Sequence, residues 1–182
     1  MPSISLAQRS GNYSYGIMAL FGSGKMGNGD LNNLAPDRTM EYFPIAGFLG
    51  YNFKKLRLGL NYEYVVVNQA TSPSEVNFTN LTGKETNLGL RIEYFSGKYS
   101  GGIILKPSSS YSLTKTTGNG ESSSYKSNFG YGVQITAQIR KEIGLVFDYS
   151  ATTYNESLSD EDVAMNRFSV GIILSNFKSG RN

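Results

Sequence analysis

The chain contains no cysteine and no histidine among its 182 residues. Without cysteine it can form neither a disulfide bond nor a thiolate metal site. Without histidine it lacks the side chain that most often serves as a general base and as a metal ligand. We therefore expect a protein without catalytic residues, metal or cofactor. The acidic stretch 159–163 does not change this expectation, because its spacing matches no calcium-binding loop.

Long apolar runs and a strong net charge are also missing. No stretch approaches the roughly 18 apolar residues that a membrane helix needs, and the start, MPSISLAQRSGN, lacks the apolar segment of a secretory signal. A net charge of +3 is too small to indicate a nucleic-acid partner. The length predicts one domain spanning 1–182, either cytoplasmic or a mature chain without its signal.

Glycine (21), tyrosine (13) and phenylalanine (10) are abundant, which favours strands and turns over helices. Eight segments alternate between apolar and small or polar residues, with the period of two that indicates a strand. They span about 12–22, 41–53, 56–67, 86–95, 98–106, 128–139, 143–152 and 166–177. Pro44 makes the second segment the least regular.

Long and short connections alternate between these segments. The long ones span 23–40, 68–85, 107–127 and 153–165, and the short ones lie at 54–55, 96–97 and 140–142. In an up-and-down meander, all long loops then lie at one end and all short turns at the other. Barrels of the bacterial outer membrane have this asymmetry. The sequence thus predicts an all-β fold, an eight-stranded antiparallel transmembrane barrel with four long outside loops and three short periplasmic turns.

Each strand has an apolar face and a polar face. The apolar faces, expected to contact lipid, contain Leu58, Leu60, Leu88, Leu90, Ile92, Val133, Ile135, Leu145, Phe147, Val170, Ile172 and Leu174. The polar faces, expected to line the lumen, contain Arg57, Asn61, Glu63, Asn87, Arg91, Glu93, Gln134, Asp148 and Arg167. The same faces contain Gly59, Gly89, Gly132, Gly144 and Gly171. Inward side chains fill an eight-stranded barrel, so glycine there makes room for long polar neighbours.

A soluble eight-stranded barrel of the lipocalin or streptavidin kind is the alternative, because it turns its apolar face inward. Four or five large apolar residues on most strands would overfill so narrow a lumen. A closed barrel in lipid also leaves no unpaired edge amides. These arguments favour the membrane barrel.

The repeated apolar-glycine-apolar steps (LGL twice, YGV, IGL and VGI) and the ending RFSVGIILSNF resemble the small outer-membrane barrels of the OmpA transmembrane domain, OmpX and OmpW kind. The resemblance implies an outer-membrane location, contact with membrane lipid and lipopolysaccharide, and the barrel-assembly machinery as a partner during insertion. Phe177 departs from the pattern, because it is out of phase with Phe168 and five residues follow it.

Two functions remain open. Buried charges must pair, so we expect a salt-bridge network that fills the lumen, with Glu63 and Arg91 as one pair if the register of their strands allows it. A filled lumen suits a non-catalytic protein that serves envelope integrity or surface contact, with a surface ligand at its Tyr/Ser/Asn-rich loops. The alternative is a narrow channel or porin-like pathway for ions or small solutes. The Ser-rich stretch 107–127 either extends the fifth and sixth strands or forms an adaptable contact surface.

Overall fold

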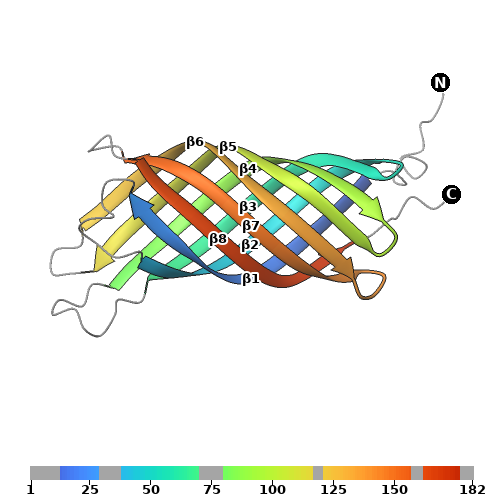
Figure 1. The fold of residues 1–182 in the computed structure, drawn as a ribbon, viewed down its shortest axis with the longest axis horizontal. Coiled ribbons are helices and arrows are strands. Elements are labelled where there is room, and N and C mark those ends of the chain that lie inside the picture. Colours follow the sequence, from blue (N-terminus) through green and yellow to red (C-terminus); the bar gives the residue numbers. More distant parts are fainter. Residues whose placement is uncertain (1–12, 29–37, 70–79, 117–120, 157–161, 177–182) are drawn as a thin grey trace, which may run out of the picture.

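The computed structural model describes residues 13–28, 38–69, 80–116, 121–156 and 162–176, and these ranges form eight strands (Figure 1). Their bounds are β1 (Tyr13–Asn28), β2 (Arg38–Phe53), β3 (Leu56–Gln69), β4 (Asn80–Ser96), β5 (Tyr99–Thr116), β6 (Glu121–Gln138), β7 (Ile143–Glu156) and β8 (Asp162–Ser175). No helix in the described ranges is long and apolar enough to cross a membrane.

The eight strands form one closed sheet. Every strand pairs antiparallel with its neighbour in sequence, and β1 also pairs with β8, where Ile17 lies opposite Leu174. Figure 1 shows the strands tilted around a common axis, with β1 beside β8. The expected eight-stranded antiparallel up-and-down barrel is confirmed.

Tight turns join the strands at one end of the barrel, which we call the turn end. Only Lys54 and Lys55 connect β2 to β3, and Phe53 pairs with Leu56 across them. Lys54 has a positive φ of 54°, and Gly97 in the β4–β5 turn has a φ of 61°. Glycine adopts this conformation freely, whereas a residue with a Cβ does so at a steric cost.

The strands run further at the opposite end, which we call the outer end, than the alternation predicts. Parts of all four expected long loops are strand instead, namely 23–28, 38–40, 68–69, 80–85, 107–116, 121–127, 153–156 and 162–165. In these stretches the outward positions are polar, as at Lys84 and Thr153, so the apolar alternation ends while the backbone ladder continues. In the stretch 107–127, β5 and β6 continue as strands, and 117–120 lie outside the described ranges.

Two irregularities lie where the outer extensions begin. Leu88 and Leu90 pair with positions on β5 that are three residues apart, so β5 has one additional residue at Lys106–Pro107. A second register shift on β6 lies at Asn128. Proline has no N–H to donate to a ladder and is therefore tolerated at a bulge. A bulge also changes which later side chains point inward, and here Ser109 is buried after it whereas Ser108 is exposed.

Pro44, which weakens the pattern of the second segment, lies inside β2 with its side chain buried. It pairs with Val65 of β3, but on the β1 side the ladder has no pair at positions 43 and 44. Because proline has no N–H to donate, the ladder between β1 and β2 is interrupted at Pro44, whereas the ladder between β2 and β3 continues.

The outward face of the barrel is an apolar belt. The twelve residues expected to contact lipid are each 40–57% exposed, although they are leucine, isoleucine, valine or phenylalanine. Aromatic pairs lie near both edges of the belt, with Tyr13 against Tyr51 at 5.3 Å and Phe21 against Phe43 at 5.2 Å between ring centroids. An exposed apolar surface of this extent requires lipid, and it excludes the soluble barrel with an apolar interior.

Candidate functional site

The interior of the barrel is the candidate site, because it contains the polar side chains that the sequence placed on one face of β3, β4, β6, β7 and β8. All nine expected lumen residues are at most 4% exposed: Arg57, Asn61, Glu63, Asn87, Arg91, Glu93, Gln134, Asp148 and Arg167. They do not form one network. The structure divides the charged ones into two clusters at different levels of the barrel.

The turn-end cluster consists of Arg57, Arg91 and Glu93, with Asn52 and Ser100 beside them. Glu93 Oε2 accepts hydrogen bonds from Arg57 Nη1 at 3.0 Å and from Arg91 Nε at 2.9 Å. Ser100 Oγ donates to Glu93 Oε1 at 2.6 Å, and Arg57 Nε donates to Asn52 Oδ1 at 3.1 Å. One carboxylate thus holds two guanidinium groups.

Aromatic rings cover the guanidinium groups of this cluster. The Arg57 guanidinium lies 4.9 Å from the centroid of the Phe48 ring and 4.4 Å from that of Phe95. The Arg91 guanidinium lies 4.7 Å from the same Phe48 ring. These cation–π contacts stabilise the two charges in a site with little water.

The outer cluster consists of Glu63, Glu85, Lys106, Asp148 and Arg167. Arg167 on β8 donates from Nη2 to Glu63 on β3 and from Nη1 to Glu85 on β4, the latter at 3.3 Å. Its Nη2 also lies 3.9 Å from Asp148 Oδ2, and Lys106 Nζ on β5 donates to Glu63 Oε2 at 2.8 Å. Because β8 lies opposite β4 in the closed order, these ion pairs cross the lumen.

Neutral groups complete the outer cluster. Lys106 Nζ also donates to Ser150 Oγ at 2.6 Å, and Asn87 Nδ2 donates to Glu63 Oε2 at 2.9 Å and to Glu85 Oε1 at 2.6 Å. Tyr154 Oη donates to Glu85 Oε1 at 2.7 Å, and the Tyr42 ring lies 5.8 Å from the Arg167 guanidinium. The cluster therefore connects β2, β3, β4, β5, β7 and β8.

An apolar layer lies between the two clusters. It consists of the buried side chains Met18, Leu20, Ala46, Phe48, Val146 and Ile173. Along β7, Val146 lies between the turn end and Asp148, which belongs to the outer cluster. Along β2, Phe48 lies on the outer side of Asn52, which belongs to the turn-end cluster. No ion pair between described residues joins the clusters across this layer.

The expected pair of Glu63 and Arg91 is wrong. In the β3–β4 register, Arg91 lies opposite Gly59, whereas Glu63 lies opposite Asn87, two inward positions farther toward the outer end. Arg91 therefore bonds Glu93 on its own strand, and Glu63 bonds cations from β5 and β8.

The residues of the outer cluster that the sequence reasoning missed include Glu85, Lys106 and Tyr154. Glu85 lies two residues from Asn87, on the same inward face of β4. The alternation of apolar residues places it in the long loop 68–85, although the inward face of β4 continues through it. Lys106 ends the inward series that begins at Ser100. Extending each alternation past its last apolar residue would have identified both.

The five expected lumen glycines differ in their surroundings. Gly89, Gly132 and Gly144 are buried, and Gly59 and Gly171 are half-buried. A Cβ on Gly59 would lie 2.7 Å from Gly50 Cα, and one on Gly171 would lie 2.7 Å from Leu20 Cα. At Gly132 the nearest atom would be 3.3 Å away. Close backbone approach therefore requires glycine at 59 and 171, but not at 132.

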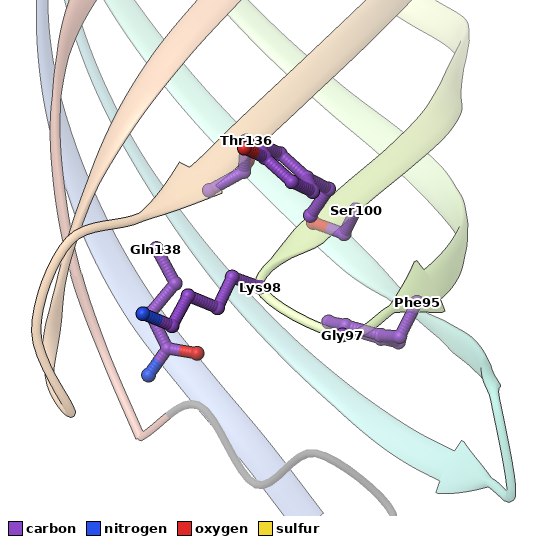
Figure 2. Close-up of a pocket in the computed structure, with 7 residues that line it drawn as sticks. Phe95, Gly97, Lys98, Ser100, Thr136 and Gln138 are labelled. Atoms are coloured by element: carbon purple, nitrogen blue, oxygen red, sulfur yellow. The ribbon is translucent and has the colours of Figure 1, made fainter.

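A small pocket lies at the turn end beside the first cluster. Figure 2 shows its lining, which comes from the β4–β5 turn and the end of β6: Phe95, Gly97, Lys98, Tyr99, Ser100, Thr136 and Gln138. It has room for about one water molecule. In the described ranges, no group of three or more acidic residues is placed to hold a metal ion.

Comparison with known proteins supports the fold. The chain is similar to Neisserial surface protein A (NspA), with a TM-score of 0.67 and 13% identity over 88% of this chain and 96% of that one. It is also similar to Ail, the attachment invasion locus protein of Yersinia pestis, with a TM-score of 0.58 and 13% identity over 90% and 99% of the two chains. No protein-family model and no curated protein matches.

These similarities confirm, at the level of the fold, the expected resemblance to small eight-stranded outer-membrane barrels. The closed barrel and its exposed apolar belt agree with an integral protein of the bacterial outer membrane.

Proposed function

We propose that this barrel is a non-catalytic protein that serves envelope integrity or surface contact through its outer end. The filled lumen carries this proposal. Arg167 joins β8 to β3 and β4 across the interior, and Lys106 joins β5 to Glu63. Opposite walls connected by buried ion pairs form a braced interior and not an open path. The absence of histidine from the sequence supports a role without acid–base chemistry.

The outer end supplies the surface for contact. β5 and β6 each contain 18 residues, whereas about 9–11 residues cross the hydrocarbon of a membrane. Their remaining residues, rich in serine with Tyr111 and Tyr125, extend beyond it. Tyrosine and serine combine contact area with adaptable hydrogen bonding, and the ligands we propose are lipopolysaccharide or the surface of another cell.

The fold is compatible with this role. Ail is an attachment invasion locus protein, and one of its structures contains the heparin analogue sucrose octasulfate. That likeness concerns the fold alone, so the support for this chain comes from its own outer extensions.

Shortening the β5–β6 hairpin tests the contact role. Ser109 and Ser127 are register partners, so a two-residue turn can replace 110–126 and keep the register of the remaining parts of β5 and β6. A matched variant joins Lys25 to Thr39, which are partners in β1 and β2. We expect at least one variant to lose binding to lipopolysaccharide vesicles or cell monolayers while it keeps heat-modifiable migration on gels. Unchanged binding by both folded variants contradicts the contact role.

A narrow channel is the second candidate, and two polar atoms in the lumen favour it. Asn61 Oδ1 and Gln134 Oε1 are buried and have no hydrogen-bond partner among the described residues, so water can solvate them. Conductance in planar bilayers separates the two functions. Steady single-channel steps would support the channel, whereas a silent bilayer containing folded protein supports the braced barrel.

A further inference from the structure

We propose that the turn-end cluster binds a small monovalent anion, of the charge and size of chloride, at Arg57 and Arg91. Both guanidinium groups bond the same carboxylate, Glu93, and all three side chains are at most 3% exposed. No second carboxylate among the described residues lies within 4.0 Å of either guanidinium. The cluster therefore has an excess of one positive charge, and a buried charge requires a counter-charge or hydrogen bonds.

Unpartnered donors indicate where the anion binds. Arg57 Nη2, Arg91 Nη1 and Asn52 Nδ2 are buried, and none has a hydrogen-bond partner among the described residues. The orientation of Asn52 is fixed, because its Oδ1 accepts from Arg57 Nε, which can only donate. All three groups are N–H donors, and hydrogen bonds from charged donors to an anion are among the strongest in proteins.

The aromatic rings leave these donors available. Phe48 and Phe95 contact the Arg57 guanidinium at 4.9 and 4.4 Å between its Cζ and the ring centroids. The cation–π contacts hold the two arginines in place, and Arg57 Nη2 and Arg91 Nη1 still have no hydrogen-bond partner among the described residues.

The outer cluster has the opposite character. It contains three carboxylates and two cations, and its unpartnered atoms include the acceptors Asn87 Oδ1 and Asp148 Oδ2 beside one donor, Arg167 Nε. An anion would be repelled there. The preference for an anion is thus a property of the turn end and not of the lumen in general.

A small pocket at the turn end adjoins the site, although Arg57, Arg91 and Asn52 are not among its lining residues. Phe95 and Ser100 line this pocket (Figure 2). Phe95 also contacts the Arg57 guanidinium, and Ser100 donates to Glu93. Lys98 lies at the same pocket and adds a positive charge. Because Arg57 and Arg91 are buried, we take the ligand to be no larger than a halide, and methanesulfonate serves as the larger comparison anion.

Bromide locates the site directly. In crystals of the wild-type barrel soaked in sodium bromide, we expect an anomalous peak within hydrogen-bonding distance of Arg57 and Arg91. In detergent at constant sodium, chloride or bromide should raise the melting temperature by about 3 °C relative to methanesulfonate. Folded wild-type protein without a bromide peak at these arginines, or with equal melting temperatures in all three salts, would overturn the proposal.

Two variants separate the site from a general salt effect. Arg91→Gln removes the excess charge and keeps the Arg57–Glu93 pair, so it should lose both the peak and the halide shift. Lys106→Gln removes the same charge from the outer cluster and should keep the halide shift at a lower melting temperature. A halide shift that survives Arg91→Gln would contradict the proposal, and if that variant fails to fold, the wild-type diffraction decides. Neither result affects the conductance and surface-binding tests of the proposed function.

Discussion

The two ionic clusters of the lumen stabilise the barrel in different ways. In the turn-end cluster, Arg57 and Glu93 are register partners on adjacent strands, and Arg91 lies two residues from Glu93 on the same strand. In the outer cluster, Arg167 joins β8 to strands on the opposite wall. Adjacent strands are already held by backbone hydrogen bonds, whereas no backbone hydrogen bond between described residues joins opposite walls. Cross-lumen pairs therefore contribute more to the shape of the barrel than local ones.

Arg167→Met should have the largest effect on stability. It leaves Glu63 with one cation and Glu85 with none, and breaking a buried pair by removing one partner costs about 3–5 kcal/mol. Urea unfolding in detergent micelles, followed by circular dichroism, measures the loss. The double variant Arg167→Met with Glu85→Gln should recover part of it, and a double variant less stable than the single one would contradict the cross-lumen pairing.

Gly59→Leu should have the next largest effect. Gly59 pairs with Gly50 where β2 and β3 approach closely beside the turn-end cluster, and a side chain there meets backbone. Overpacking of this kind costs about 1–3 kcal/mol or more. Leu60→Val on the outward face is the control and should change folding yield little. Equal folding yields on heat-modifiability gels would contradict the assignment of the two faces.

Arg57→Met should cost less than Arg167→Met, about 1–2 kcal/mol. Glu93 keeps its bonds to Arg91 and Ser100 in this variant, and the methionine side chain can still pack between the two phenylalanine rings. The same urea experiment measures both variants. A larger loss for Arg57→Met than for Arg167→Met would reverse the comparison between the clusters.

Lys54→Gly should give the smallest change, a gain of about 1 kcal/mol. Lys54 has a positive φ of 54°, which a residue with a Cβ adopts at a steric cost. Relief of this strain should raise the urea midpoint. Lys55→Gly, at the neighbouring position without that conformation, is the control and should not raise it.

The faces of the strands and the turn end could be predicted from the sequence, because both depend on short-range patterns. The alternation around Leu58 and Leu90 places these residues on the outward face, and tight turns leave strand ends little freedom. The outer extensions lack this signal, because their outward positions, such as Lys84 and Thr153, are polar.

The ion pairs could not be predicted for a different reason. Whether Glu63 meets Arg91 or Arg167 depends on strand register and on the relative height of opposite walls, which the closure of the barrel determines. The bulge at Lys106–Pro107 adds one residue to β5 and changes which later positions face inward. The local pattern of a single strand encodes neither its register with its neighbours nor its height relative to the opposite wall.

The partnership of the first strand with the last has a consequence for biogenesis. Gly24 and Arg167 are direct neighbours in the finished sheet, yet more than a hundred residues separate them along the polypeptide. A contact of such sequence separation forms slowly, since a long loop must close first. Until the final hairpin docks, Glu63 and Glu85 have no guanidinium and must stay hydrated. Completion of the cylinder is thus the step at which the interior loses its water and the carboxylates gain their cation.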